Sequence, residues 1–269
     1  MFSPSQHDAI IGPSPRTRDT PEKAGGTAHA KILLWESDQD VAARRAIDGL
    51  VNFFPKSLAC NERLHVETLY CVIGALAGFA VQHAVRQENV ASGKATEAEV
   101  FAIAQGADGQ RYYFGDRINA LLVPASLGSI AIWSILAGEA LRLGADMADL
   151  PDCPEISERT ARSIGTAGFG IPELPPNHKP ALTPRRAIEI FWPAISNGFS
   201  RAPATPVAEF KLLAPRYWPL ALATVAASYM PKTTPPLAPA LAVKIFMEAA
   251  IPMSKIDQGA VQFVGATKH

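Results

Sequence analysis

The chain has 269 residues, of which 48% are apolar, and its 25 basic and 25 acidic side chains give a formal net charge of zero. An apolar share of this size can build a core, which excludes a chain that is unfolded as a whole. Zero net charge argues against a nucleic-acid-binding protein that depends on bulk positive charge, so we expect no nucleic-acid partner. Three cysteines cannot form a disulfide framework.

Residues 1–30 are rich in Pro, Gly, Ser and Thr, and their only apolar cluster is Ile10–Ile11. A secretory signal needs a continuous apolar stretch of about 7–15 residues behind a basic start, and this segment has none. We therefore predict a disordered N-terminal tail and a cytoplasmic protein. A docking peptide, or an export signal read by a receptor, is the alternative interpretation of the same residues.

The stretch from Ile118 to Gly138 has no charged side chain and reaches the length that a bilayer-spanning helix requires. Pro124 interrupts it, and an asparagine and three serines dilute its apolar character. A second apolar stretch, Leu69–Val81, is too short to span a bilayer. We therefore predict that both are buried core helices and that the protein has no membrane partner.

Two helices are predicted before residue 90. In the first, Val41, Ile47, Leu50 and Phe54 recur at helical spacing, which indicates one buried and one solvated side, and we expect Pro55 to end it. The second helix, about 62–88, is apolar on every side over its middle turns, which is typical of a helix enclosed by others.

Gly74 and Gly78 are four residues apart inside this second helix. Each glycine in a helix interior costs about 1 kcal/mol relative to alanine, so two of them need a structural reason. The spacing predicts a close crossing, in which the backbone of a neighbouring helix lies against the two glycines.

A change of period at 100–114 predicts a β-hairpin. Two short runs of β-branched and aromatic residues flank Asp108-Gly109, a strong hairpin signal. Tyr112 and Tyr113 fall on opposite faces of the second strand, so we expect one of them to stay near solvent. Because an isolated two-stranded ribbon is marginal in water, the hairpin should lie against helices or pair with a second copy.

Residues 149–183 contain six prolines and three glycines, which predicts a connector. We place a helical lobe with the hairpin at 31–148, a second helical lobe at 184–256, and a flexible C-terminus at 257–269. The predicted fold class is mainly α: a helical bundle-like domain with one β-hairpin and two lobes joined by the Pro/Gly-rich connector.

The common catalytic and nucleotide-binding motifs do not occur in this sequence. Cys60, Cys71 and Cys153 lack the Cys-x-x-Cys spacing of a structural zinc site, and we predict no metal and no cofactor. The glycine-rich run 165–170 follows a predicted helix and precedes a Pro-rich stretch. A phosphate cradle needs a helix start after its loop, so we interpret this run as a loop.

Two clusters supply candidate ligand-binding residues. His65 and Glu67 lie at the start of the second helix, where a buried carboxylate would have a raised pKa unless it is paired. The alternative role of Glu67 is to complement the helix dipole. Tyr112, Tyr113 and Asp116 bring aromatic and acidic groups together beside the hairpin, either as a binding surface or as ordinary structural residues.

Three functions remain open. The first is a non-enzymatic protein–protein interaction or assembly protein, whose hairpin edge pairs with a partner or with another copy by strand addition. The alternative is an enzyme or a small-ligand-binding protein with a pocket between the lobes, covered by the loop 165–170. The second alternative is a membrane-associated protein that uses residues 118–138.

Overall fold

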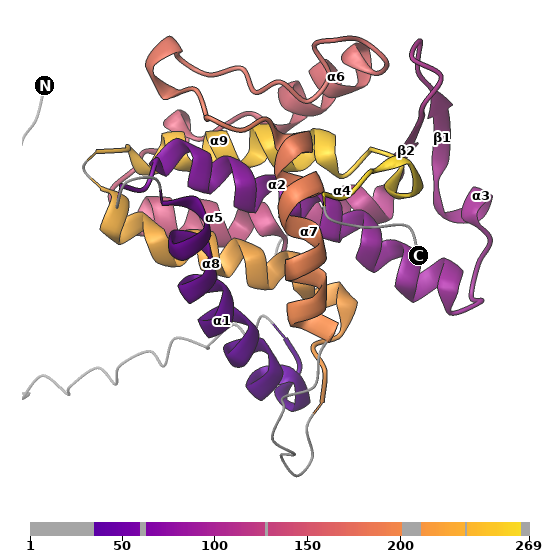
Figure 1. The fold of residues 1–269 in the computed structure, drawn as a ribbon, viewed down its shortest axis with the longest axis horizontal. Helices are drawn as coiled ribbons and strands as arrows, with labels where there is room; N and C mark the ends of the chain where they lie inside the picture. Colours follow the sequence, from indigo (N-terminus) through magenta and orange to yellow (C-terminus); the bar gives the residue numbers. More distant parts are fainter. Residues whose placement is uncertain (1–34, 60–62, 127–128, 201–210, 235, 265–269) are drawn as a thin grey trace, which may run out of the picture. The chain divides into compact units, whose positions relative to one another are not determined.

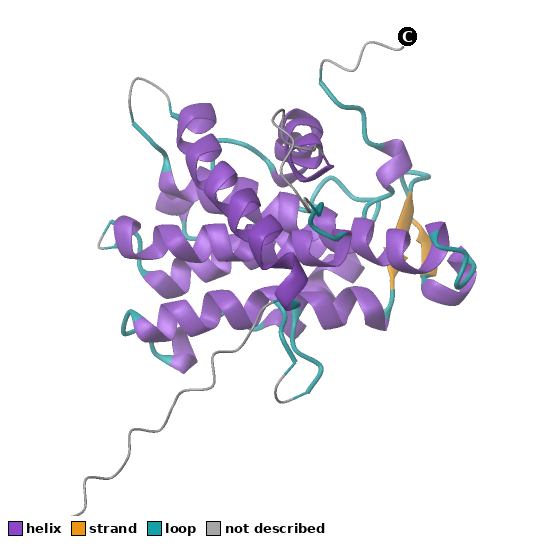
Figure 2. Ribbon diagram, turned by 90° about the horizontal axis from the view of Figure 1, so that it is seen from below, coloured by secondary structure: helices purple, strands orange, loops and turns teal. Residues whose placement is uncertain are grey.

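The computed structural model describes residues 35–59, 63–126, 129–200, 211–234 and 236–264. Over these residues it is mainly helical with a single two-stranded antiparallel hairpin, which confirms the mainly α class and the one β-hairpin of the prediction (Figures 1 and 2). The predicted tail over residues 1–30 lies outside them. The helices and strands are α1 Asp40–Leu58, α2 Val66–Val85, α3 Glu97–Val100, β1 Ala102–Gln105, β2 Arg111–Phe114, α4 Asp116–Leu122, α5 Ile132–Arg142, α6 Cys153–Ser163, α7 Pro184–Ser200, α8 Trp218–Thr233 and α9 Pro239–Met253.

Helix α2 lies at the centre of the core, packed against α7, α8 and α9. The predicted close crossing is with α9, because a Cβ atom on Gly74 would collide with the backbone carbonyl of Phe246. A Cβ atom on Gly78 would collide in the same way with Ala250, so the two helices run parallel with their backbones in contact. Helices from both sides of the predicted connector therefore contribute to one hydrophobic cluster.

The predicted connector contacts this core through an ion pair between a partly exposed arginine and a buried carboxylate. In α6, Nη2 of Arg159 lies 2.6 Å from both carboxylate oxygens of Glu248, a buried residue of α9. Nη1 of the same guanidinium lies 2.8 Å from the carboxylate of Glu173. Because breaking this pair leaves an uncompensated buried carboxylate, these contacts hold the connector against α9.

The prediction that Pro55 ends the first helix is wrong, because α1 continues to Leu58. Proline has no N–H group, so the carbonyl of Val51 loses its usual donor inside the helix. The hydroxyl of Tyr229, in α8, donates to this carbonyl over 2.6 Å. A donor from another helix thus replaces the missing hydrogen bond and lets α1 continue.

Helix α7 also contains an internal proline, and a donor from outside the helix again replaces the missing hydrogen bond. Pro193 lies inside it, which deprives the Glu189 carbonyl of its helical donor. The backbone N–H of Val264 donates to that carbonyl over 2.9 Å. The described end of the chain is thereby attached to α7.

The stretch 118–138 does not form one continuous helix, since α4 ends at Leu122 and α5 begins at Ile132. Among the described residues, one helix, Val66–Ala91, is long and apolar enough to cross a membrane by length and composition. It is α2 together with a π-helical continuation, and 94% of the apolar window is buried inside the protein. A buried core helix passes the same length and composition test, so this finding is weak support for a membrane span.

The hairpin pairs β1 with β2 in antiparallel register from Ala102–Phe114 to Gln105–Arg111. Tyr112 and Tyr113 are both buried, with exposed fractions of 2% and 0%, so the expectation that one stays near solvent is wrong. Other segments cover both faces of β2, whereas β1 is largely exposed.

Candidate functional site

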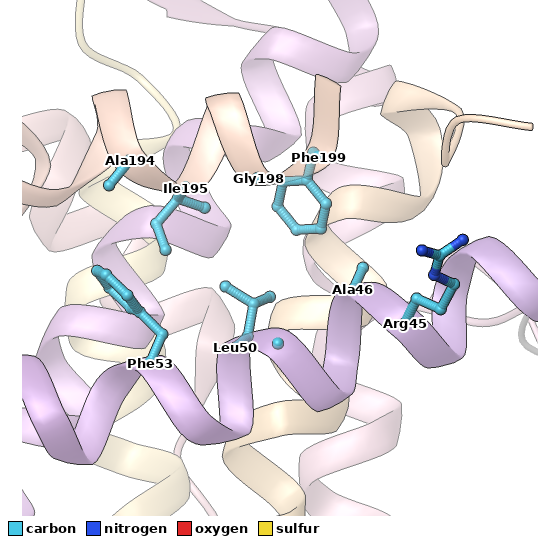
Figure 3. A pocket seen from close by; sticks show the side chains of 9 residues that line it. Arg45, Ala46, Leu50, Phe53, Ala194, Ile195, Gly198 and Phe199 are labelled. Carbon is cyan, nitrogen blue, oxygen red and sulfur yellow. The ribbon is translucent and has the colours of Figure 1, made fainter. Parts of the chain in front are cut away.

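An apolar cleft lies between α1 and α7 (Figure 3). Its volume is about 220 Å³. In both helices the lining positions recur at helical spacing. They therefore form one face of α1 and one face of α7, and these two faces point toward each other across the cleft. The lining residues are Arg45, Ala46, Gly49, Leu50, Phe53, Ala194, Ile195, Gly198 and Phe199.

The walls of the cleft are almost entirely apolar. Figure 3 shows Leu50 and Phe53 reaching from α1 toward Ile195 and Phe199 on α7, with the two helices running in opposite directions. Buried Leu50, Ile195 and Phe199 connect this lining to the hydrophobic core. A molecule in the cleft would therefore contact aliphatic and aromatic carbon on both sides.

Two glycines keep the cleft open. A Cβ atom built on Gly49 or on Gly198 would meet no other atom within 4 Å. Both residues lie inside helices, where glycine costs about 1 kcal/mol relative to alanine. The open space beside them is the room that a larger side chain would occupy.

A stack of aromatic rings supports one wall. Phe199 stacks on Trp218 with ring centroids 4.7 Å apart, and Trp218 stacks on His83 at 5.0 Å. The edge of Trp192 closes on His83 from another side. Burial lowers the pKa of His83 below its ordinary value, which favours a neutral imidazole within this stack.

Arg45 is the charged residue of the lining. Figure 3 shows its guanidinium at one end of the cleft, beyond Ala46. The side chain is exposed. The cleft thus has an apolar length and a cationic end.

The predicted candidates His65 and Glu67 lie at the start of α2, in a different place. Nδ1 of His65 accepts a hydrogen bond from the backbone N–H of Thr68 over 3.3 Å and so caps the helix. The Glu67 carboxylate lies 2.9 Å from Nδ1 of His178 and 3.5 Å from Nε2 of His65. Burial acts to raise the pKa of Glu67, but the hydrogen bond with His178 and the neighbouring histidines lower it overall.

This cluster ties the connector to α2. Beside Glu67 and His178, the N–H of Ala181 donates to Oγ1 of Thr68 over 2.8 Å. His178 was not predicted, because it lies 111 residues from Glu67 and no local pattern links the two.

Tyr112 joins the hairpin to the loop 165–170. Its hydroxyl donates to Asp108 over 2.9 Å and accepts from the N–H of Gly165 over 3.2 Å, while its ring contacts Phe169. Burial, followed by the bond to Asp108, raises the pKa of Tyr112. The loop therefore packs on the hairpin rather than over the α1–α7 cleft.

Tyr113 and Asp116 complete the predicted set. The guanidinium of Arg86, just beyond the end of α2, lies 4.3 Å from the Tyr113 ring centroid, and Phe101 packs on the ring edge. The Tyr113 hydroxyl is buried without a hydrogen-bond partner among the described residues. Asp116 is exposed in the first turn of α4.

The five predicted residues do not form one site. His65 and Glu67 lie at one end of α2, and Tyr113 packs at the other end, about 30 Å away at 1.5 Å per residue. None of the five lines the α1–α7 cleft. The cleft was not predicted, because its two walls are some 145 residues apart in the chain.

The described cysteines do not provide a nucleophile. Burial raises the pKa of both Cys71 and Cys153 to about 12, so their thiols are protonated near neutral pH. Among the described residues, no group of three His, Cys, Asp or Glu side chains is placed to hold a metal ion.

Comparison with known proteins adds no relative. A scan against protein-family models, a search of curated proteins and a search of solved structures each found no match to this chain.

Proposed function

We propose that this protein binds a small molecule with an apolar body in the cleft between α1 and α7. The observation that carries the proposal is the cleft itself, about 220 Å³ of open volume with an apolar lining. An engineered apolar cavity of about 150 Å³ binds benzene, so this volume suits about nine non-hydrogen atoms. This function is the small-ligand alternative that the sequence left open, but the residues of the proposed site differ from the predicted candidates.

The chemistry of the lining favours binding over conversion of the ligand. Apolar walls stabilise a ligand by removing its surface from water, at about 25 cal/mol per Å² of apolar area. The polar groups that would do acid–base or nucleophilic chemistry, such as Glu67 and Tyr112, are held by other partners outside the cleft. These features support a binding function for the proposed site.

A titration with 1-octanol, an apolar probe of nine non-hydrogen atoms, tests the proposal. Tryptophan fluorescence reports on the cleft, because Phe199 stacks on Trp218. We expect a saturable change of emission with the full chain. In Gly198→Leu and Gly49→Leu the added side chain fills the cleft, so the change should be lost.

The matched control is Gly138→Leu. Gly138 also lies in a helix, α5, with open space around its Cβ position, but outside the cleft. This variant should bind 1-octanol as the natural chain does. The proposal fails if the natural chain shows no saturable change, or if all four proteins respond alike.

The interaction or assembly function is a second candidate, favoured by the free edge of β1. The N–H of Tyr113 donates outward to Lys255, so Ile103, paired with Tyr113, also turns its backbone groups outward. Those groups have no hydrogen-bond partner among the described residues, and the Ile103 side chain is 42% exposed.

A second copy of this chain is the occupant we propose for this edge. Residues 102–105 carry no charge, so two such edges can approach without repulsion. Ile103→Lys adds like charges to both edges and should convert a dimer to a monomer in sedimentation equilibrium, whereas Ile103→Thr should not. A monomer before any substitution contradicts this candidate.

A further inference from the structure

We infer that the ligand of the α1–α7 cleft is a monocarboxylate with an apolar body of about seven to nine carbons. The inference rests on the proposed function and adds the charge of the ligand to it. It comes from the position of Arg45 relative to the apolar lining.

The cleft has one polar end. Eight of its nine lining residues are apolar or glycine, and Arg45 stands at one end of the row (Figure 3). A ligand that buries a carbon chain between Leu50 and Phe199 would place its terminal group beside this guanidinium. An amphipathic anion matches that distribution of apolar surface and positive charge.

Arginine suits a carboxylate in particular. The guanidinium is planar, stays charged at any physiological pH, and presents N–H groups in a fork that pairs with both carboxylate oxygens. It carries five N–H donors, so one side chain can serve a ligand and a protein neighbour together.

The other charged residues on this part of α1 do not line the cleft. Arg44, beside Arg45, is paired with Asp40 over 2.8 Å. Asp48, one turn further along α1, is exposed and is not part of the cleft lining. Arg45 is the one charged side chain among the lining residues, and a single arginine favours a monoanion over a group with two or more charges.

The test compares octanoate with 1-octanol on the full chain at pH 7.5, by calorimetry and by tryptophan fluorescence. Because the contact with Arg45 is exposed, we expect octanoate to bind about two- to fivefold more tightly than 1-octanol. The preference should shrink as salt is raised. In Arg45→Met, which keeps an unbranched apolar stem, the two probes should bind equally and 1-octanol should bind as before.

The outcomes separate this inference from the proposed function. Equal binding of both probes by the natural chain overturns the carboxylate preference and leaves the cleft as a binding site. Binding of neither probe overturns both proposals. A preference that survives in Arg45→Met, or octanoate binding that survives in both Gly198→Leu and Gly49→Leu, shows that the anion binds elsewhere and overturns the inference.

A further control asks whether protein fills the cleft. If a second copy of the chain occupies it, Gly198→Leu should change the sedimentation coefficient without any ligand, and that result overturns the inference. An unchanged coefficient, together with loss of octanoate binding, supports it.

Discussion

The two places where glycines face a neighbouring helix differ in what lies opposite. At the crossing of α2 and α9, the space beside Gly74 and Gly78 is filled by the backbone of α9. Between α1 and α7, the space beside Gly49 and Gly198 is open. A glycine in a helix can thus bring two backbones into contact or leave room for something that is not part of the chain.

The surroundings of the helices explain the difference. Helix α2 is enclosed by α7, α8 and α9, so any gap along it would lie in the core and would cost packing energy. Helix α1 has an exposed side with Arg44, Asp48 and Asn52, and its cleft opens toward solvent. A gap at the edge of the core costs less, and a ligand can fill it.

The largest expected effect is on the crossing of α2 and α9, where the two backbones are in contact. Gly78→Ala places a methyl group against the backbone of Ala250, which cannot move as a flexible side chain could. We expect the free energy of unfolding to fall by about 3 kcal/mol, at the upper end of overpacking costs. Urea denaturation measures this, and an unchanged midpoint would show that the helices are further apart than described.

The next effect is a pH dependence of the free energy of unfolding, which comes from a buried lysine next to α9. Lys255 follows α9, and burial lowers its pKa to about 8 from an ordinary 10.5. Between these values the unfolded chain holds a proton that the folded chain has lost, so stability rises with pH. From pH 8 to pH 10 we expect this lysine to add about 2 kcal/mol to the free energy of unfolding.

Lys255→Met isolates that contribution. Relative to Lys255→Met, the natural chain should become more stable as the pH rises. The other titrating groups are common to both proteins, so they do not affect this comparison. Parallel pH profiles for the natural chain and Lys255→Met would contradict the buried position of Lys255.

A smaller effect concerns the hydrogen bond that attaches α1 to α8. Tyr229→Phe removes the donor to the Val51 carbonyl and should cost about 1 kcal/mol. In a Pro55→Ala background, the new N–H at position 55 can donate to that carbonyl within the helix. The cost of Tyr229→Phe should then be smaller, and an equal cost in both backgrounds would argue against the replacement donor.

The smallest expected effect is a gain in stability, whereas the first was a loss. Gly49→Ala should raise the free energy of unfolding by up to about 1 kcal/mol, because alanine favours the helix and its methyl group meets no other atom. Gly198→Ala should do the same. A loss of stability in either variant would mean that the cleft is filled.

Local patterns could be predicted because the residues that set them are neighbours in the chain. The spacing of Gly74 and Gly78 predicted a close crossing, and Asp108-Gly109 predicted the hairpin, both as the structure has them. The partners could not be predicted. Nothing near Gly74 indicates Phe246, 172 residues later in the sequence.

The errors share one physical cause, which is a contact from a distant segment. Pro55 was expected to end a helix because its own neighbours offer no replacement donor, but Tyr229 supplies one across 178 residues. One of Tyr112 and Tyr113 was expected to stay near solvent, but the loop at Gly165 covers Tyr112, and Arg86 packs on Tyr113. The cleft belongs to the same class, since it needs the facing sides of two helices from opposite halves of the chain.

A crystal structure of the full chain grown with octanoate tests the central claim most directly. We predict the carbon chain between α1 and α7, in contact with Leu50 and Phe199, and the carboxylate beside the guanidinium of Arg45. A cleft that is occupied by another part of the protein, or octanoate bound only at other places, would contradict the account.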